Sequence, residues 1–197
     1  MDKKTIHPIF IGDTAQKTSE RDIKGEYVSM LGDTFYKIKN YDGMPPFFMS
    51  IVSSSDHWLF ISSTGGLSAG RGSAEQSLFP YYTEDKLTEN SENTGNKSIL
   101  LVTRGEQVNL WEPFSERYRG LYQIERNIYK NVIGTVIVFE EINHTLKLSY
   151  RYAWQTGDTF GFVKTTWLSN FDASVCRIEV VDGIQNILPA NITSLIQ

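Results

Sequence analysis

The segment from Leu146 to Trp154 alternates strictly between two kinds of side chain. Leucine and aromatic residues occupy every even position, and Lys, Ser, Arg or Ala occupies every odd position. A period of two puts successive side chains on opposite faces of a β-strand, so that one face is apolar and the other is polar. The pattern predicts an antiparallel strand whose core-facing side chains are Leu148, Tyr150, Tyr152 and Trp154.

Strand-like patterns extend over most of the chain. From Glu26 onward, short runs rich in aromatic and β-branched residues alternate with turn-forming clusters. Three consecutive antiparallel strands are predicted across 118–154, with turns at Lys130–Asn131 and Asn143–His144. Further strands are expected at 47–54, 57–63, 98–105, 107–114, 160–170 and 175–183.

These strands and turns together favour one fold class. About ten to thirteen strands joined by short turns predict an all-β fold in which two large antiparallel sheets stack as a sandwich. A single domain over residues 1–197 accounts for the length. The only helical candidate is the short stretch 72–79, so little helix is expected. The polar run 83–98 has little to bury and is predicted to be an exposed loop.

The stretch from Ser62 to Pro80 is rich in glycine and contains Arg71. A phosphate-binding P-loop requires Lys and then Ser or Thr after its last glycine, whereas Arg71 and Gly72 stand in those places. Nucleotide binding is therefore not expected. The part from Ser62 to Phe79 is predicted to be a long loop over an edge of the sandwich. There Arg71 would contact a ligand or anchor the loop to a neighbouring domain or subunit.

Charge, cysteine content and hydropathy argue against several classes of protein. The formal net charge of −4 disfavours nucleic acid as a partner, since phosphate binding requires a basic surface. The single cysteine, Cys176, can form no internal disulfide, which fits a reducing compartment. The sequence has no apolar run long enough to span a membrane and no secretory signal pattern. A cytoplasmic location is expected, unless a signal has been trimmed away.

The polar residues offer no complete catalytic or metal-binding set. The three histidines lie far apart in the sequence, so no metal site or cofactor is predicted. Two pairs of carboxylates have the composition that glycoside hydrolysis requires, namely Glu112 with Glu116 and Glu140 with Glu141. Neighbouring residues of one strand point to opposite faces, however, so Glu140 and Glu141 are not expected to act together.

The tryptophans provide the remaining functional clue, because sugars bind by stacking on aromatic faces flanked by hydrogen-bonding groups. Trp154 and Trp167 lie inside predicted strands and are expected in the core. Trp111 ends a predicted strand directly before Glu112, and this pair is the better candidate for sugar contact. Core or rim packing is the alternative for Trp111. Arg71 is the third candidate for substrate binding.

The segment Leu146–Pro189 is similar to the N-terminal β-supersandwich domain of large carbohydrate-active proteins related to cellobiose and chitobiose phosphorylases. The matching features are Trp154 at the end of a strand, the turn at Gly157–Asp158, and Leu168 with Asn170 before the next strand. The upstream run "NLWEPF" also matches the placement of an aromatic residue after a strand. The resemblance implies a galactose-mutarotase-like supersandwich. In that family the catalytic acid lies downstream, in a helical barrel, which implies that this chain is an N-terminal module of a longer protein.

Two classes of function follow from these observations. The first is a non-catalytic β-sandwich module of a glycoside hydrolase or phosphorylase type of enzyme. Such a module packs on a downstream catalytic domain of the same chain, with sugar binding or homodimer formation as further contributions. The second is an independent protein, either a mutarotase-like sugar epimerase or a free-standing sugar-binding protein. An epimerase requires a histidine and a carboxylate placed over the sheet as acid and base.

Overall fold

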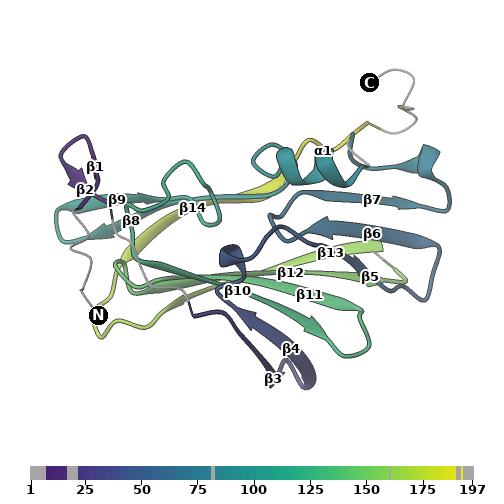
Figure 1. The fold of residues 1–197 in the computed structure, drawn as a ribbon, viewed down its shortest axis with the longest axis horizontal. Coiled ribbons are helices and arrows are strands. Elements are labelled where there is room, and N and C mark those ends of the chain that lie inside the picture. Colours follow the sequence, from purple (N-terminus) through teal and green to yellow (C-terminus); the bar gives the residue numbers. More distant parts are fainter. Residues whose placement is uncertain (1–7, 17–21, 81–82, 160, 190–191, 193–197) are drawn as a thin grey trace, which may run out of the picture.

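The computed structural model describes residues 8–16, 22–80, 83–159, 161–189 and 192. Two stacked layers of antiparallel strands form its body (Figure 1). One layer is a six-stranded sheet, and the other consists of two three-stranded sheets that lie side by side. Helix accounts for 7% of the residues, which confirms the predicted all-β class with little helix.

The six-stranded sheet has the strand order β13–β12–β11–β10–β4–β3. Its strands are β3 (Lys24–Met30), β4 (Asp33–Lys39), β10 (Ile124–Asn131), β11 (Val136–Asn143), β12 (Leu148–Gly157) and β13 (Gly161–Asn170). The strands from β10 to β12 are the three predicted consecutive strands. Their turns occupy residues 132–135 and 144–147, slightly later than predicted, because pairing continues to Asn131 and Asn143.

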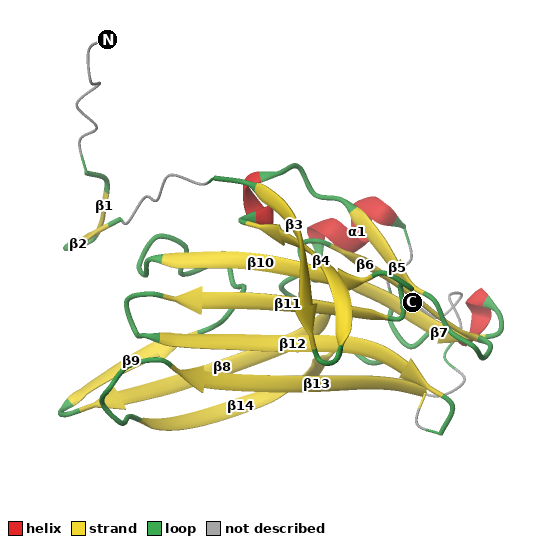
Figure 2. Ribbon diagram, turned by 90° about the horizontal axis from the view of Figure 1, so that it is seen from below, coloured by secondary structure: helices red, strands yellow, loops and turns green. Residues whose placement is uncertain are grey.

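The second layer contains two sheets of three strands. The first sheet has the order β14–β8–β9, with β8 (Gly95–Arg104), β9 (Gln107–Trp111) and β14 (Arg177–Gln185). The second has the order β5–β6–β7, with β5 (Phe48–Ile51), β6 (His57–Ser62) and β7 (Leu67–Arg71). A small hairpin of β1 (Phe10–Ile11) and β2 (Thr14–Ala15) projects from the body (Figure 2), and Gln16 at its base lies against Gly120.

The main core lies between the two layers. The alternation of β12 is confirmed, since Leu148, Tyr150, Tyr152 and Trp154 are all at most 2% exposed. Tyr152 stacks on Phe139 of β11, with ring centroids 4.9 Å apart and an interplanar angle of 5°. Offset-stacked aromatic pairs add to the free energy gained from burial of their apolar area.

A smaller apolar cluster lies on the opposite face of the six-stranded sheet. The β3–β4 hairpin folds across this face (Figure 2) and packs Phe35 against Tyr129, Val138 and Ala153. Trp167 of β13 packs against the same cluster. Trp154 therefore lies in the main core, as expected, whereas Trp167 contributes to this second cluster.

The glycine-rich segment 62–79 differs from its prediction as one long loop. Ser62 ends β6, a tight turn follows, and β7 runs back along β6. The glycines allow close contacts, since a Cβ on Gly66 would lie 1.9 Å from the backbone oxygen of Leu87, and one on Gly70 would lie 2.3 Å from the Trp58 ring. A strand of such small residues has too weak an apolar alternation to be recognised in the sequence.

The polar run 83–98 was also predicted wrongly as an exposed loop throughout. It contains the short helix α1 (Glu84–Glu89), whose Leu87 is 1% exposed, and the first residues of β8. The other helical segments are the 3-10 turns η1 (Tyr41–Gly43) and η2 (Ala74–Gln76), the second of which lies in the helical candidate 72–79. Among the residues that the structure describes, no helix is long and apolar enough to cross a membrane.

Candidate functional site

A buried arginine on β10 forms the centre of a charged region inside the sandwich. Arg126 is the cross-strand partner of Glu141 on β11, so both side chains point to the inner face of the six-stranded sheet. Their relative exposures are 5% and 2%, and Arg126 Nε donates to Glu141 Oε2 over 2.8 Å. Burial alone would lower the pKa of Arg126, but Glu141 and the neighbouring Glu116 outweigh burial and raise it.

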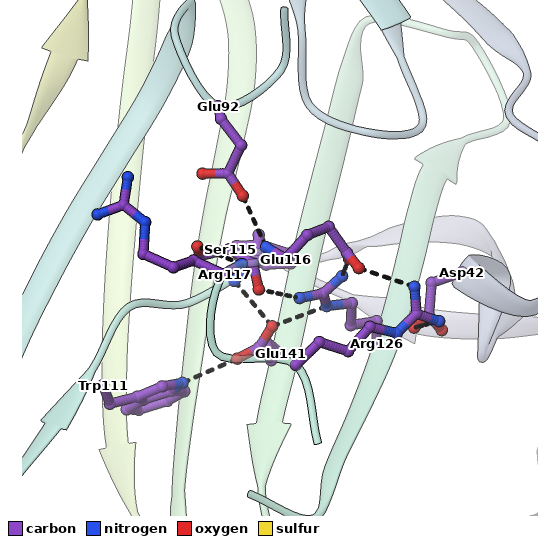
Figure 3. Close-up of polar contacts among 10 residues, drawn as sticks. Asp42, Glu92, Trp111, Ser115, Glu116, Arg117, Arg126 and Glu141 are labelled. Atoms are coloured by element: carbon purple, nitrogen blue, oxygen red, sulfur yellow. Dashed lines mark hydrogen bonds and ion pairs between the residues drawn. The ribbon is translucent and has the colours of Figure 1, made fainter. Parts of the chain in front are cut away.

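Glu141 also fixes the segment that follows β9 (Figure 3). Its Oε1 accepts a hydrogen bond from Trp111 Nε1 at 2.8 Å, and its Oε2 accepts one from the backbone N–H of Phe114 at 2.7 Å. Phe114 has a φ of 67°, a left-handed conformation that costs free energy for a bulky side chain. The buried carboxylate holds the backbone in this conformation.

A chain of alternating charges runs outward from Arg126 (Figure 3). Glu116 pairs with Arg126 through Oε1, and its Oε2 accepts a hydrogen bond from Arg119 at 2.7 Å. Arg119 in turn lies 4.0 Å from the carboxylate of Asp42. Burial alone would raise the pKa of Glu116, but the two arginines outweigh it and hold the pKa below its ordinary value. Glu116 is therefore an anion at neutral pH and is not poised to act as a general acid.

A second set of ion pairs supports the same loop from the side of β8. Glu92 accepts a hydrogen bond from the backbone N–H of Glu116 at 2.6 Å and pairs with Lys97 at 3.1 Å. Lys97 also pairs with the buried Glu112. Burial alone would lower the pKa of Lys97, but its two carboxylate partners raise it. The segment from Glu112 to Arg119 is thus held on two sides by charged groups.

A cavity of about 310 Å³ opens beside Arg126. Its walls combine two aromatic rings, four hydroxyl groups, two carboxylates and two guanidinium groups with apolar side chains. The lining residues are Tyr41, Asp42, Met44, Pro46, Ser63, Thr64, Ser91, Phe114, Glu116, Arg119 and Arg126. Burial raises the pKa of the Tyr41 hydroxyl, so that this group stays protonated and can donate a hydrogen bond. We refer to this space as the Arg126 cavity.

The structure brings two of the three predicted site residues into this region. Trp111 is 2% exposed and Glu112 is 7% exposed, and both belong to the ion-pair network that supports the Arg126 cavity. Neither residue lines the cavity itself. Arg71 lies at the end of β7, in the other three-stranded sheet, where its exposed side chain pairs with Asp56 at 3.2 Å. The three residues therefore do not form one site.

Of the residues that line the Arg126 cavity, the sequence singled out Glu116, as a carboxylate paired with Glu112, and the others were missed. A signal for them exists on β10 and β11, where Arg126 precedes Ile128 and Glu141 follows Phe139 on core-facing positions. Charged residues on the apolar faces of two neighbouring strands indicate a buried ion pair. Tyr41, Ser63 and Ser91 come from distant segments and carry no such signal.

The expected separation of Glu140 from Glu141 is also observed. Glu140 lies on the outer face, where it accepts hydrogen bonds from Tyr129 at 2.5 Å and Asn127 at 2.8 Å, and pairs with Arg151. The two carboxylates thus belong to separate networks on opposite faces of one sheet. Within the described part of the chain, no three His, Cys, Asp or Glu residues are grouped so that they could hold a metal ion.

Two histidines lie among the described residues. His57 shares a hydrogen bond of 2.6 Å with the Ser55 hydroxyl, and His144 lies 3.9 Å from the carboxylate of Glu125. Neither histidine lines the Arg126 cavity. The arrangement of groups around that cavity therefore suits binding of a polar ligand rather than acid–base chemistry by histidine.

Comparison with known proteins adds no relative to this description. No protein-family model matches the sequence, and a search of curated proteins finds no match.

Proposed function

We propose that this chain is a non-catalytic β-sandwich module of a carbohydrate-active protein, of glycoside hydrolase or phosphorylase type, and that its Arg126 cavity binds a neutral sugar. The resemblance of 146–189 to the N-terminal domains of cellobiose and chitobiose phosphorylase relatives supports the family. The two-layered antiparallel architecture is consistent with the galactose-mutarotase-like supersandwich that this resemblance implies.

The composition of the Arg126 cavity is the observation that carries the sugar proposal. Ligand pockets of about 300 Å³ and above bury small molecules, and the 310 Å³ here suits one sugar ring. Tyr41 and Phe114 offer aromatic surface, and the hydroxyls of Ser63, Thr64 and Ser91 both donate and accept hydrogen bonds. The two carboxylates and two guanidinium groups balance in charge, which favours a neutral polyol over an ionic ligand.

Arg126 retains hydrogen-bonding capacity for such a ligand. Its guanidinium donates to Glu141, Glu116 and the backbone oxygen of Ser115. A guanidinium carries five N–H donors, so two remain for sugar hydroxyls. Because three donors are already engaged, the group is held in one orientation before the ligand arrives, which lowers the entropic cost of binding.

An exposed apolar face supports the second part of the proposal, docking on another domain. On the outer face of the β14–β8–β9 sheet, the register places Ile99 beside Val181 and Leu101 beside Leu110. Each of these four side chains is at least 37% exposed. A contiguous apolar sheet face of this kind marks an interaction surface, and we propose that the downstream catalytic domain of the same chain covers it.

Calorimetric titration with cellobiose, chitobiose and glucose tests the sugar proposal. We expect saturable binding of at least one of these sugars. Arg119→Met should lower the affinity about tenfold or more, because a hydrogen bond to a charged group contributes about 1.5–3 kcal/mol. Arg117→Met is the matched control, since Arg117 is an exposed arginine of the same loop that does not line the cavity.

Two outcomes would contradict the sugar proposal. If no sugar reaches saturation with the wild-type chain, the cavity does not bind this class of ligand. If Arg117→Met and Arg119→Met weaken binding to the same extent, the sugar is held elsewhere, and the charge of the loop acts only at long range.

A further inference from the structure

A small polar recess adjoins the Arg126 cavity, and the two spaces share the lining residues Thr64, Ser91 and Phe114. The recess has a volume of about 20 Å³. A single water needs about 10–15 Å³, so the recess accepts one water-sized group and no second sugar ring. Tyr152 of β12 also lines it, and we refer to it as the Tyr152 recess.

The hydroxyl group of Tyr152 is the feature that points to a ligand. Tyr152 is 2% exposed, and its contacts within the described part of the chain are ring contacts with Phe114, Phe139 and Tyr150, which leave the hydroxyl without a hydrogen-bond partner there. Buried tyrosine hydroxyls usually find a partner. Burial raises the pKa of this hydroxyl, so the group stays protonated and can donate. The lack of a side chain at Gly65 keeps space beside it, since a Cβ there would lie 3.4 Å from Tyr152 Oη.

The charged groups of the recess favour a neutral ligand group. Lys97 and Glu92 both line the recess, and their side chains pair at 3.1 Å. Lys97 also pairs with the buried Glu112. Two carboxylates thus surround one ammonium group, so a carboxylate on the ligand would be repelled. An ammonium group has three N–H donors, which leaves one for a neutral hydroxyl.

We propose that the Tyr152 recess receives the exocyclic hydroxymethyl group of the sugar in the Arg126 cavity, and that the Tyr152 hydroxyl hydrogen-bonds to it. This inference rests on the proposed sugar binding and adds the class of sugar. A neutral hexose fits both spaces. A pentose lacks the group that fills the recess, and a uronic acid carries a carboxylate in its place.

Four monosaccharides separate these possibilities in calorimetric titrations. D-Glucose and 6-deoxy-D-glucose differ only in the terminal hydroxyl, D-xylose lacks the whole hydroxymethyl group, and D-glucuronate replaces it with a carboxylate. We expect the last three to bind more weakly than glucose, by about tenfold or more, because a site built to hydrogen-bond a hydroxyl rejects analogues that lack it.

Tyr152→Phe tests the role of the hydroxyl itself. The substitution keeps the ring that stacks on Phe139 and removes a hydroxyl that has no partner in the described part of the chain. We expect glucose to bind this variant no better than 6-deoxyglucose does, while the stability to urea stays at the wild-type level. Tyr41→Phe is the matched control, since Tyr41 lines the Arg126 cavity but not the recess. It should leave the ratio of the two affinities unchanged.

Four results would overturn the inference. Equal affinities of the wild type for glucose and 6-deoxyglucose would mean that the recess holds only water, and the sugar proposal would stand. A wild-type ratio in Tyr152→Phe would mean that another group recognises the hydroxyl. A clear loss of stability in Tyr152→Phe would give the hydroxyl a structural role. The fourth result is no saturable binding of any of the four monosaccharides, whereas the sugar proposal fails only if cellobiose and chitobiose do not bind either.

Discussion

Glu141 connects several parts of the molecule. Its carboxylate accepts hydrogen bonds from β9, from the loop after β9 and from β10, through Trp111, Phe114 and Arg126. Burial of two charges is costly unless each is paired and hydrogen-bonded. Here Arg126 and Glu141 are paired with each other and hydrogen-bonded. Removal of one charge should therefore leave the other buried without its partner.

Glu141→Gln is therefore predicted to lower the free energy of unfolding by about 3–5 kcal/mol, the usual cost of breaking a buried ion pair. Urea denaturation followed by tryptophan fluorescence measures this change. Glu140→Gln is the control on the opposite face of the same strand. Its partner Arg151 is 41% exposed and can regain water, so the loss should be clearly smaller. Equal losses for the two variants would show that burial of Arg126 is not what makes Glu141 important.

Asp182 makes the stability of the sandwich depend on pH. Its carboxylate on β14 accepts hydrogen bonds from Ser98, Tyr150 and Lys164, so it links β14 and β8 to β12 and β13. Burial alone would raise the pKa of Asp182, but Lys164, Ser98 and Tyr150 hold it below the ordinary value of 3.8. A lowered pKa in the folded state means that the ion stabilises the fold above the ordinary pKa, and that this contribution is lost as the pH falls through the lowered value.

The prediction is that Asp182→Asn is less stable than the wild type at pH 7, and that the difference shrinks as the pH falls below about 4. Thermal unfolding at several pH values between 7 and 3 measures it. A difference in stability that stays constant over this range would mean that the ionised form of Asp182 contributes nothing that its neutral form lacks.

At the scale of elements, β12 contributes large buried side chains from the six-stranded sheet to the main core. Tyr152 is 2% exposed and stacks on Phe139, so Tyr152→Ala should cost about 3–5 kcal/mol, as large-to-small aromatic changes in cores do. Ser149→Ala on the opposite face is the control and should change the stability by less than about 0.5 kcal/mol. Chemical denaturation of both variants provides the comparison, and a small loss for Tyr152→Ala would reverse the assignment of the two faces.

The elements differ in how well their sequences predict them, for a physical reason. The strand β12 has large apolar residues at every second position, so its period is visible without knowledge of its neighbours. The strand β7 is buried through small residues such as Ala69 and Gly70, and the Trp58 ring lies against Gly70. The helix α1 has only Leu87 to bury. In both cases packing against a partner surface determines the structure, and no apolar period within the element reveals it.

The candidate site, too, could be predicted from the sequence only in part. Trp111 and Glu112, the predicted sugar contacts, are buried beside the Arg126 cavity but do not line it, so their role in sugar binding stays a prediction. The cavity itself is built from segments between Tyr41 and Arg126. Their contact depends on the stacking of the two layers, and no local pattern encodes it.

At the scale of the whole molecule, the outer face of the β14–β8–β9 sheet should act as an interface. The double variant Leu101→Lys/Val181→Lys is predicted to fold with a stability within about 1 kcal/mol of the wild type, since both side chains already face outward. It should bind less of a hydrophobic dye and self-associate less in sedimentation experiments. Leu100→Lys, on the buried face of β8, is the contrasting control and should disrupt folding. Unchanged dye binding and self-association in the double variant would argue against this face as an interface.

The central claim is that a neutral sugar occupies the Arg126 cavity, and backbone amide shifts during titrations with glucose, cellobiose and chitobiose test it most directly. The account predicts saturable shifts grouped at Ser63, Thr64, Ser91 and Arg119, which come from separate parts of the sequence and meet only at this cavity. Little change is expected at Arg71 or on the outer face of the β14–β8–β9 sheet. Saturable shifts at those places with none around the cavity, or no saturable shifts at all, would contradict the claim.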